Sequence, residues 1–234
     1  MFFSQPIHIN AQEITNSEDG KTIMIMIVQN GKTTFLEGEQ AEDYLNEKKL
    51  ETDKLKQAKL NLQNKNYFKS TDSLSEIMPI ETVHYFNVYE EVGSSEDVHR
   101  YDLKENITEY WKNSTSTQQS HTFGWASSCK WTTNITLESA EKKALKAVVG
   151  SSWQKEYSNN GSVTINVVPG KTVWMTYYPI MDNSYGNMEY VKVDLLGNVT
   201  VLLSKWVDTY SPSLLYNPLL DADVPNGVYE WREK

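Results

Sequence analysis

Side chains that could carry chemistry are few in this chain, and their spacing does not gather them into a site. The candidates are His8, His84, His99, His121 and Cys129. No two histidines have the four-residue helical spacing through which paired imidazoles reach one metal ion, which argues against zinc. A nucleophile pair of Cys129 and His121 would need a third group to orient the imidazole and donors for an oxyanion, and the sequence indicates neither.

Oxygen ligands occur at suggestive spacing from Asp182 to Glu189, which reads DNSYGNME. A calcium loop of the EF-hand type needs a bidentate carboxylate at its twelfth position, where this chain has Val193. The stretch therefore favours a turn. Gly-rich phosphate loops and a nucleophile elbow are absent as well. We expect a protein that is not an enzyme and that uses neither a metal nor a cofactor.

Composition restricts the partners. The 234 residues carry a net charge of −9, which excludes nucleic acid because its phosphates need Lys and Arg. Seven Trp and fourteen Tyr indicate a folded chain.

A single cysteine cannot form an intrachain disulfide, which fits a cytosolic protein or an exported bacterial one. Residues 1–11 resemble the tail of a secretory signal without its basic region; the alternative is an ordinary terminus.

The pattern predicts three regions: a flexible N-terminus or signal remnant at 1–19, a hairpin-plus-helix unit with its linker at 20–75, and an antiparallel β domain at 76–234. A β-hairpin is predicted over 21–36 around Asn30-Gly31, with an apolar run at 22–28 that indicates cover on both faces. Residues 39–64 lack Gly and Pro and predict a helix. A Ser/Thr/Asp stretch at 70–75 would be the linker.

After Glu81 the hydrophobic period becomes two, which is typical of strands. Hairpins are predicted at 83–103, with a turn at 93–95, and at 188–206, with a turn at 196–198. Between them, two Ser/Thr-rich stretches with aromatic residues flank the charged segment 138–146, which could be a short helix or a charged hairpin cap. The fold class is therefore mainly β, with elongated or sandwich-like antiparallel sheets and an α+β composition overall.

Exposed aromatic side chains are candidates for a sugar-binding platform or a membrane-interface belt. The residues that we expect on such an aromatic surface are Trp111, Trp125, Trp174, Tyr177 and Tyr178. The alternative for each of them is core packing between two sheets.

The run from Gly150 to Tyr157, GSSWQKEY, and the run GSVTINVVPGKTVWMTY from Gly161 to Tyr177 resemble the late strands of aerolysin/epsilon-toxin-like β-pore-forming proteins. The stretch STSTQQSHTFGW, from Ser114, resembles their earlier long strand. Related-looking exported proteins of Gram-positive bacteria share these features. The resemblance implies secretion, assembly into a homo-oligomer and insertion of an amphipathic hairpin into a membrane.

By position, that hairpin would lie at 135–149, although the charged and helix-prone segment 138–146 departs from the family pattern. The residues that could then face lipid are Ile135, Leu137, Leu145, Ala147 and Val149. We expect an exported, non-enzymatic, pore-forming or membrane-active protein. The alternative is a secreted β-sandwich that binds a glycan or another cell-surface partner. Long continuous strands with a hairpin lying over them would favour the first function.

Overall fold

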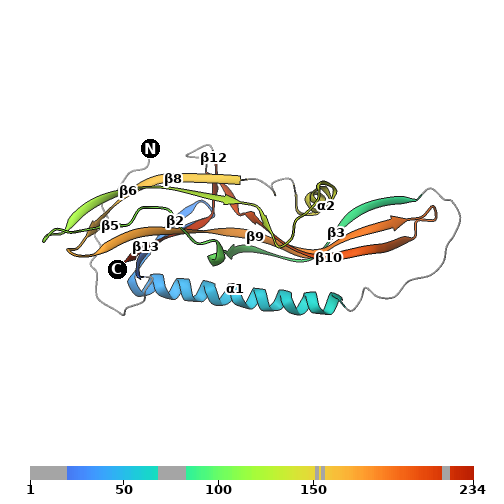
Figure 1. The fold of residues 1–234 in the computed structure, drawn as a ribbon, viewed down its shortest axis with the longest axis horizontal. Coiled ribbons are helices and arrows are strands. Elements are labelled where there is room, and N and C mark those ends of the chain that lie inside the picture. Colours follow the sequence, from blue (N-terminus) through green and yellow to red (C-terminus); the bar gives the residue numbers. More distant parts are fainter. Residues whose placement is uncertain (1–19, 68–82, 151–152, 154–155, 218–221) are drawn as a thin grey trace.

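The computed structural model describes residues 20–67, 83–150, 153, 156–217 and 222–234. The fold is mainly β, with antiparallel sheets and two α-helices, and the molecule is elongated (Figure 1). This confirms the predicted fold class. The predicted terminus 1–19, including the signal-like residues 1–11, and the predicted linker 70–75 lie outside the described residues.

Strand β9, Thr172–Val193, is the central strand of the nine-stranded sheet and pairs with other strands along both of its edges. One edge of β9 pairs first with β13, Gly227–Glu233, and then with β10, Val199–Pro212. The sequence predicted a turn at 182–189, and that prediction is wrong because the strand is continuous there. Asn183 and Ser184 are buried inside the continuous strand, where side-chain hydrogen bonds replace the turn that their residue types favour.

The other edge of β9 pairs with three strands in succession. They are β5 (Trp111–Lys112), β4 (Glu105–Asn106) and β3 (His84–His99). The predicted hairpin over 83–103 is therefore wrong. Residues 84–99 form one strand, and the Gly and Ser residues that indicated a turn lie near two irregularities in its register, between Glu91 and Gly93 and between Ser95 and Val98.

The N-terminal hairpin belongs to the same sheet. Strand β1 (Lys21–Gln29) pairs with β2 (Lys32–Glu37) on one edge and with β13 on the other. The predicted unit at 20–75 thus shares its sheet with the C-terminal end of the chain. Its helix is α1, Gly38–Tyr67, which agrees with the predicted helix at 39–64.

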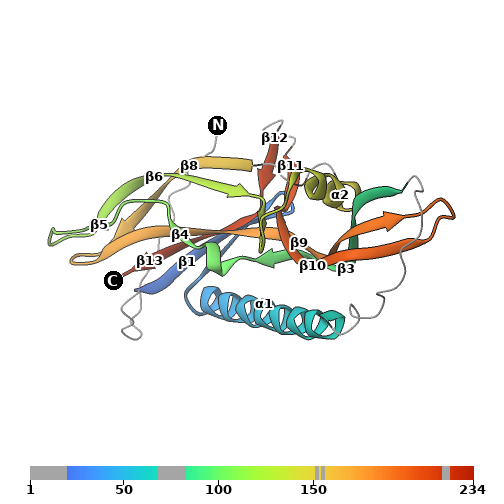
Figure 2. The same ribbon diagram turned by 45° about the vertical axis from the view of Figure 1, so that its right-hand side comes forward.

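A second layer consists of β6 (Gln119–Lys130) and β8 (Glu156–Val167), which, among the strands that the structure describes, pair only with each other. Between them the chain forms β7 (Thr132–Thr133), which pairs with β10, and helix α2 (Ser139–Val149). Figures 1 and 2 show the β6–β8 pair on one side of the sheet and α1 on the opposite side. The remaining elements are a 3-10 helix, Tyr101–Leu103, and the paired strands β11, Leu214–Asn217, and β12, Ala222–Pro225.

The two layers explain the unbroken apolar run of β1. Its consecutive residues Met24 and Ile25 point to opposite faces and are both buried. Met24 belongs to the cluster under β6 and β8, and Ile25 belongs to the cluster under α1. The expected cover on both faces is confirmed. Since each such cluster needs a partner layer, the β6–β8 pair and helix α1 complete the core of the sheet from opposite sides.

Gly186 gives a test of the continuous β9 strand. A Cβ atom at this position would lie 2.1 Å from the carbonyl oxygen of Glu90 and 2.9 Å from the backbone nitrogen of Val92. We expect Gly186→Ala to lower the free energy of unfolding by about 1–3 kcal/mol, because backbone cannot move aside as a flexible side chain can. Gly124→Ala is the control, since a Cβ there meets nothing within 4 Å. Urea denaturation that shows equal stability for both variants would contradict this register.

Candidate functional site

The β6–β8 hairpin has two chemically different faces. Along β6, inward-facing Phe123, Trp125 and Cys129 alternate with outward-facing Ser, Thr, Gly and Ala residues. Along β8, Ile165 and Val167 are buried, and the alternate positions from 158 to 166 are occupied by Ser, Asn and Thr. Because side chains alternate across a strand, the face toward the sheet is apolar at most positions, with Gln119, His121, Ser127 and Asn159 as its polar members. The other face consists of small, mostly polar residues apart from Lys130 and Glu156.

The polar face is tied together across the two strands. Ser120 Oγ donates to Asn166 Oδ1 at 2.5 Å, and the hydroxyls of Thr122 and Thr164 lie 2.7 Å apart. The charged residues of the two strands are confined to one end, where Lys130 is opposite Glu156. The remainder of the hairpin is free of Asp, Glu, Lys and Arg over about ten residues in each strand, counted from the register.

Aromatic contacts attach the hairpin to the sheet. Phe123 lies edge-on to Trp231 at a ring distance of 4.9 Å, and Trp125 contacts Tyr229 at 4.6 Å. His121 stacks on Trp111 at 4.5 Å. No strand of the nine-stranded sheet is hydrogen-bonded to β6 or β8 in a ladder. The hairpin is therefore held by side-chain packing.

Only a few described hydrogen bonds reinforce this packing. The hydroxyls of Ser127 and Tyr229 lie 3.0 Å apart, and Asn159 Nδ2 donates to the same Tyr229 oxygen at 3.4 Å. Asn113 Nδ2 donates to the carbonyl oxygens of Thr117 and Val167 at 2.8 and 2.7 Å, which fixes the loop that leads into β6. The contact surface between hairpin and sheet is thus mostly apolar, with a few polar contacts that include the buried pair Ser127 and Tyr229.

Helix α2 occupies the place where the sequence predicted the membrane hairpin. A capping box between Glu138 and Glu141 begins the helix, so the charged segment is helical and not a strand cap. Leu137 and Leu145 are buried against Met188 and Val207 of the main sheet. Ile135 and Val149 are half-buried at the margin of this cluster, and Ala147 is exposed. These five residues therefore do not form a strand face.

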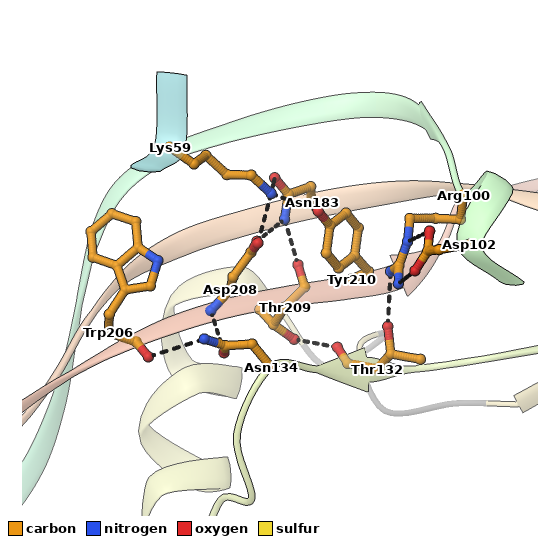
Figure 3. A network of polar contacts seen from close by, with 10 residues as sticks. All are labelled: Lys59, Arg100, Asp102, Thr132, Asn134, Asn183, Trp206, Asp208, Thr209 and Tyr210. Atoms are coloured by element: carbon orange, nitrogen blue, oxygen red, sulfur yellow. Dashed lines mark hydrogen bonds and ion pairs between the residues drawn. The ribbon is translucent and has the colours of Figure 1, made fainter. Parts of the chain in front are cut away.

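A polar network anchors both α1 and the segment that follows β6 to the sheet (Figure 3). From α1, Lys59 Nζ donates to Asp208 Oδ2 at 2.7 Å and to Tyr210 Oη at 2.5 Å. Asn183 Nδ2 donates to the other Asp208 oxygen at 2.7 Å. Lys59 is almost fully buried, so this carboxylate is the ion-pair partner that offsets the burial of its ammonium group.

The network continues to β7. Arg100 makes a bidentate ion pair with Asp102, at 2.6 and 2.8 Å, and donates to Thr132 Oγ1 at 3.1 Å. Thr209 Oγ1 donates to the carbonyl oxygen of Thr132 at 3.1 Å. Asn134 accepts a hydrogen bond at 2.8 Å from the backbone nitrogen of the network's Asp208. We call the whole network, from Lys59 of α1 to Asn134, the latch, because it connects both α1 and the chain after β6 to the sheet.

The predicted aromatic surface is not assembled on an exposed face. Trp174, Tyr177 and Tyr178 are buried in the core. Trp111 and Trp125 are half-buried, and they contact the hairpin and the sheet as described above. Their residue types suggested a platform, but the sheet uses them as packing between its layers.

The other candidates for chemistry are also separated. His84 and His99 lie at opposite ends of β3, and Cys129 and His121 are eight residues apart on β6, roughly 26 Å in an extended strand. Within the described residues, no group of three His, Cys, Asp or Glu side chains could hold a metal ion. No helix in the described part of the chain is long and apolar enough to span a bilayer.

An open groove of about 780 Å³ runs beside β6. It lies between residues 105–109 and the hairpin, and Thr122, Gly124 and Ser128 contribute to its wall. Solvent therefore reaches the polar face of β6 from this side.

The feature that sequence reasoning missed is the two-faced hairpin itself. Its signal was the alternation of side chains through 119–130 and 156–167, on either side of the helical segment.

The chain matches no protein-family model, no curated protein and no solved structure. The resemblance to aerolysin/epsilon-toxin-like proteins therefore stays an expectation that depends on the residues quoted for it.

Lys59 gives a test of the latch. We expect Lys59→Met to lower the free energy of unfolding by about 3 kcal/mol, because it leaves Asp208 without its cation in a partly buried position. Lys48→Met is the matched control: its partner Glu51 is exposed and on the same helix, so we expect a change below about 0.5 kcal/mol. Equal effects in urea denaturation would mean that the latch does not secure α1.

His99 makes the attachment of α1 sensitive to acid. Burial, with a smaller contribution from Lys48, lowers the pKa of His99 to about 4, while Glu51 and Asp97 act in the opposite direction. Its ring contacts Tyr44 of α1. Because the unfolded chain binds this proton more readily, the contribution of His99 to stability is full above about pH 6.5 and is lost as the pH falls toward 4.

We expect the stability of the protein to decrease by on the order of 2–3 kcal/mol between pH 7 and pH 4, and His99→Gln to remove most of this slope. The measurement is urea denaturation at half-unit pH steps. Asp182, whose pKa is raised by burial, acts in the opposite sense and is present in both proteins, so the difference between them isolates His99. Identical slopes would rule out His99 as the acid-sensitive group.

Proposed function

We propose that this chain is an exported, non-enzymatic, pore-forming protein of the aerolysin-like kind, in which the β6–β8 hairpin is the segment that enters the membrane. The observation that carries the proposal is the division of the hairpin into an apolar and a small polar face. A pore of antiparallel strands needs this alternation, because one face of each strand meets lipid and the other meets water.

The length of the strands supports the proposal. Each strand of the hairpin has 12 residues, and a tilted strand crosses a bilayer in about 9–11 residues. The main sheet contains strands of 22, 16 and 14 residues, well beyond the usual five or six. Such strands with a hairpin lying over them are the arrangement that favours the membrane-active function over a compact binding module.

Storage of the hairpin follows from its contacts. Phe123, Ile165 and Val167 are buried against the sheet, and returning each of them to water would cost about 1.5–3 kcal/mol. The hairpin therefore stays docked until another apolar phase replaces the sheet. Since no ladder joins it to the main sheet, leaving requires no backbone hydrogen bonds of the sheet to be broken along its length.

Oligomerisation follows from the same geometry. A single hairpin in hydrocarbon would leave the outer N–H and C=O groups of β6 and β8 unsatisfied, at several kcal/mol each. Pairing with hairpins from other copies removes these edges. The segment with α2 would then lie beyond the hairpin's end, and release of the latch at Thr132 and Asn134 would have to precede insertion.

The test uses neighbouring residues of β8 that belong to opposite faces. We expect Val163→Asp, on the apolar face, to abolish dye release from liposomes, because a carboxylate would face lipid. Ser162→Asp, on the polar face, should keep dye release and shift the pore toward cations. Dye release and an SDS-resistant oligomer band are measured together, and thermal melting checks that both variants fold. Loss of release in both folded variants, or in neither, would contradict this orientation of the hairpin.

A further inference from the structure

The end of the molecule farthest from the hairpin carries an unusual density of exposed apolar side chains. This distal end consists of residues 84–88 of β3, residues 189–193 of β9, the turn 194–198 and residues 199–203 of β10, and it extends beyond both helices (Figures 1 and 2). Its exposed side chains include Tyr85, Phe86, Tyr190, Val201 and Leu203.

The turn presents two leucines at the tip. Leu195 and Leu196 are 62% and 85% exposed. The turn is nevertheless well fixed: Asp194 Oδ1 accepts hydrogen bonds at 2.9 Å from the backbone nitrogens of Leu196 and Asn198, and Gly197 adopts a positive φ of 81°. Turn positions ordinarily take polar residues or glycine, whereas this fixed turn exposes two leucines to water. Departures of this kind from local sequence preference are expected at functional sites.

The exposed side chains lie on both faces of the three-stranded end. Tyr85 and Phe86 are adjacent on β3 and so point to opposite sides of the sheet. Tyr85 shares its face with Tyr190, on which its ring stacks at 5.9 Å, whereas Phe86 shares the other face with Val201 through their common neighbour Val191. A partner protein would cover one face of such a sheet; an apolar medium surrounds the end from all sides.

Charge separates this end from the remainder of the chain. Residues 84–88 and 189–203 carry one cation, Lys192, and two anions, Glu189 and Asp194, in a protein with a net charge of −9. A surface recognised through anionic lipid would need an excess of Lys and Arg, which this end does not have. A surface rich in Tyr, Phe and Leu with few charges instead suits the interface of a zwitterionic bilayer, where aromatic rings sit at the level of the headgroups.

We propose that the distal end, led by Leu195 and Leu196, docks into the interfacial region of a bilayer of zwitterionic phospholipids. The docking is shallow. Among the described residues, β3 pairs only with β9, and residues 199–203 of β10 also pair only with β9. Their outer backbone groups need water or headgroups as partners and cannot enter the hydrocarbon core.

This inference adds to the proposed function the surface that meets the bilayer, and it rests on that function only in requiring contact with a membrane. Docking concerns β3, β9 and β10, whereas insertion concerns β6 and β8. Binding and leakage can therefore be measured separately on the same protein.

The experiment compares two double variants on vesicles of phosphatidylcholine and cholesterol. Leu195→Gln/Leu196→Gln removes the apolar tip, and Leu50→Gln/Leu60→Gln changes two similarly exposed leucines of α1. In vesicle flotation, we expect the first variant to partition at least about tenfold more weakly than the natural protein, and the second to be unchanged. Equal partitioning of all three proteins would overturn the proposal.

An environment-sensitive dye then locates the tip. Attached to Leu196→Cys, the dye should shift to the blue on these vesicles, and attached to Leu50→Cys it should not; native Cys129 is buried and so protected from labelling. A blue shift of the attached dye, without release of dye from inside the vesicles, would support the docking surface and reject the pore. Dye release with the label at 196 still in water would reject the docking surface and retain the pore. Tip-dependent dimers in sedimentation, without vesicle binding, would overturn the proposal in favour of self-association.

Discussion

The pairing of β9 along both of its edges is the constraint on which the other elements depend. The first half of this 22-residue strand lies beside β13 and the second half beside β10, with β5, β4 and β3 following one another along the opposite edge. Pro179, which lacks an N–H group, is the last residue of β9 paired with β13. One long strand thereby joins the part of the sheet that stores the hairpin to the distal end, and it makes the molecule elongated.

This arrangement divides two tasks between stable and releasable contacts. The nine-stranded sheet is held by backbone ladders, which are lost only on unfolding. The hairpin, in contrast, is held by apolar packing against residues such as Tyr229 and Trp231, and its connection to α2 is held by the latch. Apolar packing has no directional requirement, so a lipid phase can replace the sheet as the partner of the same side chains. In the proposed function, the ladder between β6 and β8 is retained in both the docked and the inserted state.

The sequence was sufficient for the parts of the fold in which local pattern and tertiary structure agree. The hairpin around Asn30-Gly31 and helix α1 were predicted near their observed bounds, and the turn at 196–198 was predicted where β9 leads into β10. It failed where tertiary pairing overrides turn-forming residues, as at Gly93 in β3 and at Asp182 to Asn187 in β9. Those polar residues are used for buried side-chain hydrogen bonds, which no local pattern reveals.

The two-faced β6–β8 pair was not predicted as a site. The family resemblance placed a membrane hairpin at 135–149, between the Ser/Thr-rich stretches, but helical propensity decided the structure of residues 139–149. The aromatic residues Trp174, Tyr177 and Tyr178 could not be assigned to core or surface from the sequence, because only the pairing of β9 with β13 settles which residues the hairpin and α1 cover.

The most direct measurement of the central claim is a pair of distances by electron spin resonance, in solution and on vesicles. One pair of spin labels is attached at Thr122 of the hairpin and Lys32 of β2, and its distance is measured by the pulsed method. The other pair is attached at Thr122 and Thr164, which lie opposite each other across the hairpin, and its short distance is measured from line broadening. If the hairpin leaves the sheet as a unit, the first distance becomes longer on vesicles and the second is unchanged. A first distance that stays constant on vesicles from which dye is released would contradict the account, since the hairpin would then have remained docked while the membrane opened.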